Sequence, residues 1–244
     1  MTSANGFGRR AFLFTLLPAS FPALFHWPRT KLSGVRFAVR SYAHSSRRFL
    51  VIHGDEDTAR DVLNAYMYDH DGVAYIVTGT TRDVEINGVK IDPNRMFTRA
   101  GAEVSIRAEN TNLDPQRVVN VLDYLDKERG KLLKRLIPPK GGRLFALHNN
   151  RDYSVQNEIA ASDQTSIKQP TNPQAFYLCT DPHDYAILKE SPFNVVLQSK
   201  ADPDDGSLSR LAARRGFRYI NLECAIGDYE GQMERLRWLE DRLP

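Results

Sequence analysis

Short apolar runs alternate along this chain with longer stretches in which apolar residues recur at helical spacing. The runs are rich in β-branched and aromatic residues, a composition typical of strands that are buried in a sheet. They predict strands over residues 35–40, 48–52, 73–78, 176–180 and 194–198, and two more that end at residues 148 and 223.

Helical spacing fills most of the stretches between these strands. It predicts helices over residues 57–69, 114–136, 205–214 and 229–243, and a short helix that opens at residue 181. Residues 114–136 give the clearest case, because Pro115 suits a first turn and Val118, Leu122 and Leu125 recur on one face. Strands that alternate with helices, without internal repeats, predict one α/β unit.

Two connecting segments have a distinct character. Residues 84–91 are interrupted by Asn87-Gly88, the dipeptide that most strongly favours a tight hairpin turn, and we expect a hairpin there. Residues 160–173 are polar and contain proline, serine and glutamine, which predicts a long surface loop that could close over a substrate.

Two histidines follow strand-like runs. His53 lies after residues 49–52 in a His-x-x-Glu pair with Glu56, and His148 ends the run 144–147. Open α/β sheets bind ligands beyond the carboxyl ends of their strands, so these side chains are candidate metal ligands at one sheet edge. By itself, His-x-x-Glu is also common in surface turns.

Two later motifs make the pattern more specific. Asn94 and Arg95 lie between the two histidine segments, and Glu223 ends the last predicted strand. In this order the set resembles the zinc carboxypeptidase family and its relatives, the succinylglutamate desuccinylase and aspartoacylase group. The resemblance covers residues 48–227. It implies a single-domain, three-layer α/β sandwich around a mixed, mostly parallel sheet, over residues 35–244.

The resemblance also implies a metal centre. Zinc would be bound by His53, Glu56 and His148, and Glu223 would act as the general base. Three protein ligands leave one position open, which is the arrangement of catalytic rather than structural zinc. Zinc lowers the pKa of water toward about 7, and a nearby carboxylate can take up the released proton.

Arginine and asparagine side chains supply the implied substrate contacts. Asn94 and Arg95 would hold a substrate carboxylate or a polarised carbonyl, a role that suits the planar, two-pronged guanidinium. Arg82 is a candidate second cation for the same pocket, although an arginine at the end of a strand is equally typical of the solvent-exposed surface.

One departure from the family pattern bears on the substrate. Digestive members carry a tyrosine in the loop before the final glutamate, whereas residues 199–206 contain none. We therefore expect a hydrolase of amide bonds in small peptides or N-acyl amino acids with a free carboxylate. An intracellular desuccinylase-like deacylase and a metal-free relative that binds peptides or cell-wall fragments are the alternatives.

Charge and composition restrict the partners. The chain has a net charge of +3 over 244 residues, and its basic residues form no stripe, so nucleic acid is not expected as a partner. Arg9-Arg10 precedes the apolar stretch 11–17, which resembles a twin-arginine export signal in residues 1–30; a disordered leader is the alternative. A signal predicts a periplasmic or secreted protein and its absence a cytoplasmic one. No stretch is long enough for a membrane span.

The two cysteines and His183 are further candidates for the site. Cys224 follows Glu223 on a predicted strand, and because neighbouring strand residues point to opposite faces, we expect it in the core. Whether it pairs with Cys179 depends on their separation, which the sequence leaves open. His183 rivals the chosen ligands, but its Asp-Pro-His-Asp context is typical of an exposed helix start.

Overall fold

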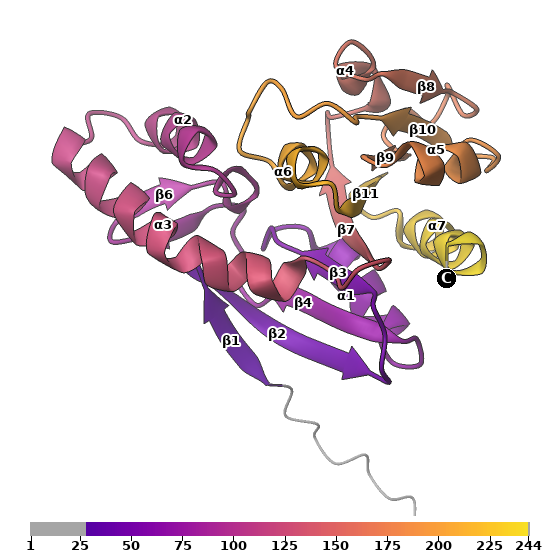
Figure 1. The fold of residues 1–244 in the computed structure, drawn as a ribbon, viewed down its shortest axis with the longest axis horizontal. Coiled ribbons are helices and arrows are strands. Elements are labelled where there is room, and N and C mark those ends of the chain that lie inside the picture. The colour runs from indigo at the N-terminus through magenta and orange to yellow at the C-terminus, as the bar shows by residue number, and fades with distance from the viewer. Residues whose placement is uncertain (1–27, 244) are drawn as a thin grey trace, which may run out of the picture.

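The computed structural model describes residues 28–243, and a nine-stranded sheet runs through this part of the chain (Figure 1). Its strands are β1 (Arg29–Leu32), β2 (Val35–Tyr42), β3 (Arg48–Val51), β4 (Gly72–Val77), β7 (Arg143–Asn150), β8 (Gln164–Ser166), β9 (Phe176–Cys179), β10 (Asn194–Leu197) and β11 (Arg218–Ala225). They lie in the order β1-β2-β4-β3-β7-β11-β9-β10-β8. The α/β class with a mixed sheet is thus confirmed.

The four central strands β4, β3, β7 and β11 are mutually parallel. Outside them, β9 and β10 also pair in parallel, whereas the β1–β2, β2–β4, β11–β9 and β10–β8 pairs are antiparallel. Parallel pairing therefore dominates only the centre, and the expectation of a mostly parallel sheet is too broad. All eight residues of β7 are buried, as expected for a strand covered on both faces.

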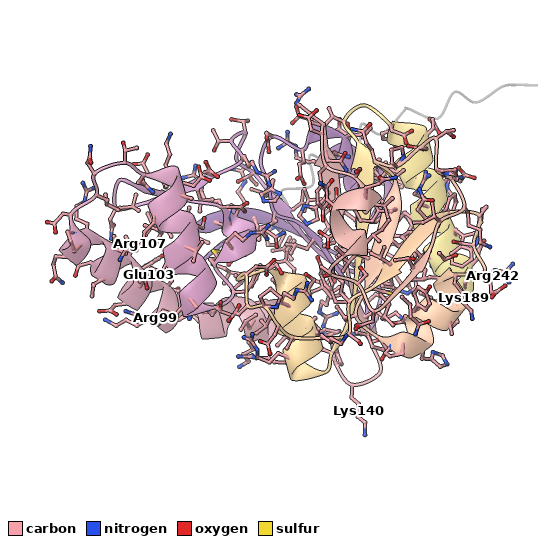
Figure 2. The ribbon with its side chains drawn as sticks, turned by 90° about the horizontal axis from the view of Figure 1, so that it is seen from above. Arg99, Glu103, Arg107, Lys140, Lys189 and Arg242 are labelled. Atoms are coloured by element: carbon pink, nitrogen blue, oxygen red, sulfur yellow. The ribbon has the colours of Figure 1, made fainter. Side chains whose placement is uncertain are left out.

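Seven α-helices occur within residues 28–243, together with one short 3-10 helix, η1 (Pro93–Arg95). They are α1 (Asp57–Tyr66), α2 (Arg99–Glu109), α3 (Pro115–Leu136), α4 (Val155–Ile159), α5 (Pro182–Leu188), α6 (Leu208–Arg215) and α7 (Tyr229–Arg242). Helices α1 and α7 contact each other and the sheet, whereas α3 and α6 lie across its other face (Figure 1). The outer side of α2 carries charged residues, including the ion pair between Arg107 and Glu103 (Figure 2).

The predicted hairpin is present as β5 (Val84–Ile86) and β6 (Val89–Ile91). Asn87 and Gly88 have φ of 53° and 73°, and positive φ at both central residues is what a two-residue turn of this hand requires. The hairpin leads directly into η1, so it delivers Asn94 and Arg95 to their place in the structure.

Four elements differ from the sequence-based expectations. Strand β1 and helices α2 and α4 were not expected, and β8 lies inside the predicted loop 160–173. Helix α2 buries few apolar side chains, among them Ala102 and Ile106, which is too weak a pattern to reveal a helix. Strand β8 is polar and exposed, and its antiparallel pairing with β10 holds it in the sheet.

Two glycines bring α2 against the segment before α6. A Cβ atom on Gly101 would lie 2.1 Å from the Cα of Gly206, and one on Gly206 would lie 2.2 Å from the carbonyl oxygen of Arg95. Real Cβ atoms do not approach other atoms this closely, so both positions require glycine. The backbone that follows η1 therefore lies in direct contact with the backbone that precedes α6.

The predicted export signal or leader, residues 1–30, lies almost wholly outside the described residues. Among the helices of residues 28–243, none has the length and apolar character that crossing a membrane requires.

Candidate metal centre

The predicted site residues converge on one pocket of about 460 Å³. Strands β3, β7 and β11 are parallel neighbours, so their carboxyl ends meet at the same sheet edge. The pocket is lined by all seven predicted residues, His53, Glu56, Arg82, Asn94, Arg95, His148 and Glu223. Residues far apart in the sequence therefore share one cavity.

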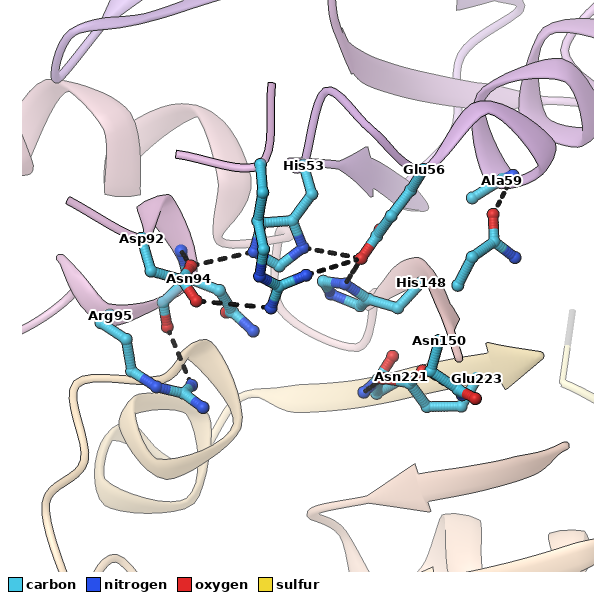
Figure 3. A network of polar contacts seen from close by, with 12 residues as sticks. His53, Glu56, Ala59, Asp92, Asn94, Arg95, His148, Asn150, Asn221 and Glu223 are labelled. Atoms are coloured by element: carbon cyan, nitrogen blue, oxygen red, sulfur yellow. Dashed lines mark hydrogen bonds and ion pairs between the residues drawn. The ribbon is translucent and has the colours of Figure 1, made fainter. Parts of the chain in front are cut away.

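Glu56 lies between the two histidines (Figure 3). Its Oε1 is 2.8 Å from Nδ1 of His53 and 3.3 Å from Nδ1 of His148, and all three side chains are buried. Glu56 directly precedes α1, where the positive end of the helix favours a carboxylate. Local structure and the two histidines thus hold this carboxylate in place.

Asp92 holds the far side of the His53 ring. Its Oδ1 lies 2.9 Å from Nε2 of His53 and also accepts a hydrogen bond from the backbone N–H of Asn94. When the His53 ring is neutral, a proton on Nε2 is donated to the ionised Asp92, which leaves the lone pair of Nδ1 for a metal ion; when the ring is protonated, Nδ1 donates to Glu56 instead. A carboxylate behind a histidine is the usual support of a metal-ligating imidazole.

The close contacts shift the pKa of each member of this cluster. Burial lowers the pKa of His53, but the charge of Glu56 and the hydrogen bonds to Asp92 and Glu56 outweigh burial and raise it to about 9. Burial raises the pKa of Glu56, but attraction to His148 and His53 outweighs that effect and lowers it to about 2. The pKa of Asp92 is lowered in the same way, by His53 and by Arg82, against the effect of burial.

The donor set fits a zinc ion. Two imidazole nitrogens and a carboxylate are zinc ligands, and potential ligand atoms of the three residues lie within 4.8 Å of one another. Zinc bonds of about 2.0–2.1 Å in a tetrahedral arrangement separate the ligand atoms by about 3.4 Å. Moreover, Oε2 of Glu56 is buried without a hydrogen bond, although Nδ1 of His148 lies 3.2 Å away. An acceptor left unmatched in the interior is expected where a cation binds.

Asn149 and Gln232 tie the two ligand segments together. The side-chain oxygen of Asn149 accepts a hydrogen bond of 2.6 Å from the backbone N–H of Ala59, in the first turn of α1. Its amide nitrogen donates to Gln232, whose own amide nitrogen donates to the backbone carbonyl of His148. This buried network fixes the start of α1, and with it Glu56, relative to strand β7.

Glu223 lies beside the metal ligands on the neighbouring strand. It pairs in register with His148, and its two carboxylate oxygens accept hydrogen bonds of 3.0 Å from Asn150 and Asn221 (Figure 3). Burial is the main cause that raises the pKa of Glu223. Both amides donate to the carboxylate, so their oxygens point elsewhere, and both oxygens are buried without a hydrogen bond.

Arg95 and Arg82 bring positive charge to the pocket from connecting segments. Arg95 follows Asn94 in η1, is partly buried, and donates a hydrogen bond from Nη1 to the carbonyl of Asn94. Arg82 is half exposed and lies 3.6 Å from Oε1 of Glu56 and 3.4 Å from Oδ2 of Asp92. Arg82 is therefore both a pocket residue and a surface arginine, the two roles that its sequence position suggested.

Several supporting residues were not recognised from the sequence. Asp92 precedes Asn94 in a segment that looked like a turn, and Asn150 follows His148 by two residues. Asn221 lies two residues before Glu223 on the same strand face, a spacing that could have identified it. Asn150 has the same spacing from His148 on β7, whereas for Asp92 the sequence carries no comparable signal, because its partner His53 lies on another segment.

Cys179, Cys224 and His183 do not line the pocket, whereas Tyr153 does. Cys224 and Cys179 are both free and buried, and Cys224 is a core residue as expected. His183 is exposed at the start of α5, where the cap is Asp181. Tyr153 lines the pocket and donates its hydroxyl hydrogen to Glu158.

No protein-family model matches the chain, and a search of curated proteins finds no match.

Proposed function

We propose that this protein is a zinc-dependent hydrolase of amide bonds, acting on small peptides or N-acyl amino acids that carry a free carboxylate. The proposal also takes the fold to be a three-layer sandwich like that of zinc carboxypeptidases. The observation that carries it is the buried cluster of His53, Glu56 and His148, which lies beside the buried Glu223. Within this cluster, Oε2 of Glu56 accepts no hydrogen bond. A zinc ion bound there would act as a Lewis acid and lower the pKa of water toward about 7.

Glu223 is suited to moving a proton at its carboxylate oxygens. Burial raises its pKa above the ordinary value of a glutamate, which makes its carboxylate a stronger base. Asn150 and Asn221 hold the two oxygens in fixed directions, so Glu223 can take a proton from water and pass it to the leaving amine. The free oxygens of the two amides can accept N–H groups of the substrate.

Arg95 and Asn94 are suited to orienting the substrate. Arg95 lines the pocket and forms no ion pair with a carboxylate among residues 28–243, so its guanidinium can take the carboxylate of a substrate through two parallel hydrogen bonds. Arg82 is already shared between Glu56 and Asp92. We therefore assign the substrate carboxylate to Arg95 and a lesser, supporting role to Arg82.

The proposal is tested by measuring the metal content of the purified protein and of three variants, His53→Ala, Glu56→Ala and His148→Ala. We expect near-stoichiometric zinc in the unaltered protein and its loss in each variant. His44→Ala is the matched control, because this exposed histidine belongs to no cluster of potential metal ligands among residues 28–243 and should leave the zinc content unchanged. A folded protein that takes up no zinc when zinc is supplied would overturn the proposal and favour the metal-free binding alternative.

A further inference from the structure

Gln232 is a fully buried polar residue on α7. It has no exposed surface, and both of its functional groups bond to β7 rather than to solvent. Its Nε2 donates a hydrogen bond of 3.0 Å to the backbone carbonyl of His148, and its Oε1 accepts one of 3.2 Å from Nδ2 of Asn149. Burying an amide costs free energy unless its groups are paired, so this pairing holds α7 against the strand that carries His148.

The hydrogen bonds around Gln232 can run in only one direction. The carbonyl of His148 can only accept, so Gln232 must turn its NH2 group toward this carbonyl and its oxygen toward Asn149. Asn149 must then donate from its own NH2 group, which leaves its oxygen for the backbone N–H of Ala59, a group that can only donate. A rotated amide at either position would place two donors or two acceptors together. We call these bonds, from His148 through Gln232 and Asn149 to Ala59, the amide relay.

The amide relay supplies the side-chain cap that α1 does not have from its own segment. Glu56 is at the cap position but makes no side-chain hydrogen bond to the first turn of the helix. The oxygen of Asn149, from another strand, accepts the bond from Ala59 instead (Figure 3). The carboxylate of Glu56 is thus left for the two histidines, and its place depends on a cap whose direction Gln232 sets from α7.

A second contact joins α1 and α7 at the opposite end of α1. The hydroxyl of Tyr66, the last residue of α1, donates to Glu240 of α7, and Glu240 also forms an ion pair with Arg47. Tyr66 lies about 15 Å from Glu56 along the helix axis, and none of these three residues lines the pocket. The two helices are therefore joined by one contact that leads to the candidate metal ligands and by one that does not.

We infer that Gln232 is a positioning residue of the candidate metal centre, which couples helix α7 to the placement of Glu56 relative to His148. Residues that support metal ligands commonly change metal affinity 10- to 100-fold when they are replaced, on the order of one to two powers of ten. Such coupling is reciprocal, so an ion bound to the ligands should hold the first half of α7 more firmly. The effect on metal affinity rests on the zinc site of the proposed function. The amide relay rests on the hydrogen bonds alone and can be tested without metal.

The test compares Gln232→Met with Tyr66→Phe. Methionine is unbranched and packs well in a core but has no amide for the relay, whereas Tyr66→Phe removes only the hydroxyl that reaches Glu240. Zinc affinity is measured by competition with a chromophoric chelator. We expect Gln232→Met to bind zinc about 10- to 100-fold more weakly, and Tyr66→Phe to stay within about twofold of the unaltered protein.

Amide hydrogen exchange gives a second readout, in the metal-free protein. Gln232→Met should speed the exchange of Ala59 and its neighbours in the first turn of α1 by about tenfold or more, because Asn149 is then free to rotate. Tyr66→Phe should speed exchange in the last turn of α1 instead. Zinc should slow exchange in the first half of α7 of the unaltered protein, and Gln232→Met should lose this slowing.

Unchanged zinc affinity in a folded Gln232→Met would overturn the inference. An equal loss in Tyr66→Phe would also overturn it, because affinity would then follow the general packing of the two helices. Circular dichroism shows whether each variant folds. If Gln232→Met misfolds, Asn149→Ser decides, because it breaks the amide relay at the next residue and should weaken zinc binding to a similar extent; unchanged affinity there would overturn the inference.

The outcomes separate this inference from the proposed function. Weaker zinc binding in Gln232→Met, with no amide hydrolysed by the unaltered protein, would remove the proposed function and leave the inference. Hydrolysis by the unaltered protein, with the same zinc affinity in Gln232→Met, would do the reverse. If the unaltered protein takes up no zinc, the exchange of the metal-free protein decides, and unchanged exchange at the start of α1 in Gln232→Met would overturn the amide relay as well.

Discussion

The two sides of the pocket are built from different kinds of structure. His148 and Glu223 lie on buried, parallel strands at the centre of the sheet, and the buried His53 and Glu56 follow another central strand. Arg82 and Arg95 belong to segments that connect β4 to α2 and are only partly buried. Groups proposed to bind a metal are thus held by the core, whereas groups proposed to recognise the substrate lie where the chain can vary.

The largest loss of turnover should come from a change at Glu223, on the side of the pocket that is formed by the central strands. Glu223→Gln keeps the shape and the buried setting of the side chain but removes its ability to accept a proton. We expect turnover of an N-acyl amino acid to fall by a factor of about 10³–10⁴, with zinc content unchanged. Glu103→Gln, a change at a partly exposed residue of α2 outside the pocket, serves as the control. Unaltered turnover would exclude Glu223 as the base.

The next largest effect concerns the pH dependence of stability, which reports on the buried contacts of His53 with Glu56 and Asp92. In the metal-free protein the pKa of His53 is raised to about 9, above its unfolded value of about 6.5. Its contribution is therefore fully present below pH of about 6.5 and is lost as the pH rises through about 9, with an upper size of about 3 kcal/mol. We expect the free energy of unfolding in urea, measured with a chelator, to fall across this range.

Zinc should reverse this trend, because the ion requires the unprotonated Nδ1 of His53 and competes with the proton. The stabilisation gained on adding zinc is therefore expected to grow between pH of about 6.5 and 9. His53→Gln should remove both the fall in the metal-free protein and the gain with zinc. Metal-free protein that becomes more stable as the pH rises through this window would contradict the assigned contacts.

A change at Arg95 tests the side of the pocket that is formed by the segments between β4 and α2. Arg95→Ala removes two charge-assisted hydrogen bonds to the substrate carboxylate, each of which contributes about 1.5–3 kcal/mol when desolvated. We expect KM to rise by a factor of about 10² or more while zinc content stays the same. The matched control is Arg99→Ala, an exposed arginine a few residues further along the chain. A large loss of zinc in Arg95→Ala would show that the residue supports the metal centre instead.

Arg82 should give the smallest effect. Its side chain is half exposed, and exposed ion pairs contribute about 0–1 kcal/mol. Arg82→Ala is therefore expected to change kcat/KM less than about fivefold and to raise the pKa of Asp92 slightly. A loss as large as that of Arg95→Ala would mean that Arg82 also binds the substrate, and the two sides of the pocket would be less distinct.

The sequence predicted the site residues at the strand ends better than it predicted the residues that contact them. His53, Glu56 and Glu223 follow or end apolar runs, and strand ends in a parallel sheet lie together, so their meeting could be anticipated. The contact between His53 and Asp92 could not, because it joins residues 39 positions apart, with α1, β4 and the β5–β6 hairpin between them. Arg210, which also lines the pocket, was not anticipated for another reason. In the sequence it looks like one of several solvent-exposed helix arginines, and only the packing of α6 shows that it is buried.

The contact between Gly101 and Gly206 sets where Arg95 lies. With no side chain on either residue, the backbone that follows η1 and the backbone that precedes α6 are held at the closest approach that the chain allows. A side chain at either glycine would push the segment that bears Arg95 away without touching His53, Glu56 or His148, so the preference between substrates could change while the candidate metal centre stayed the same.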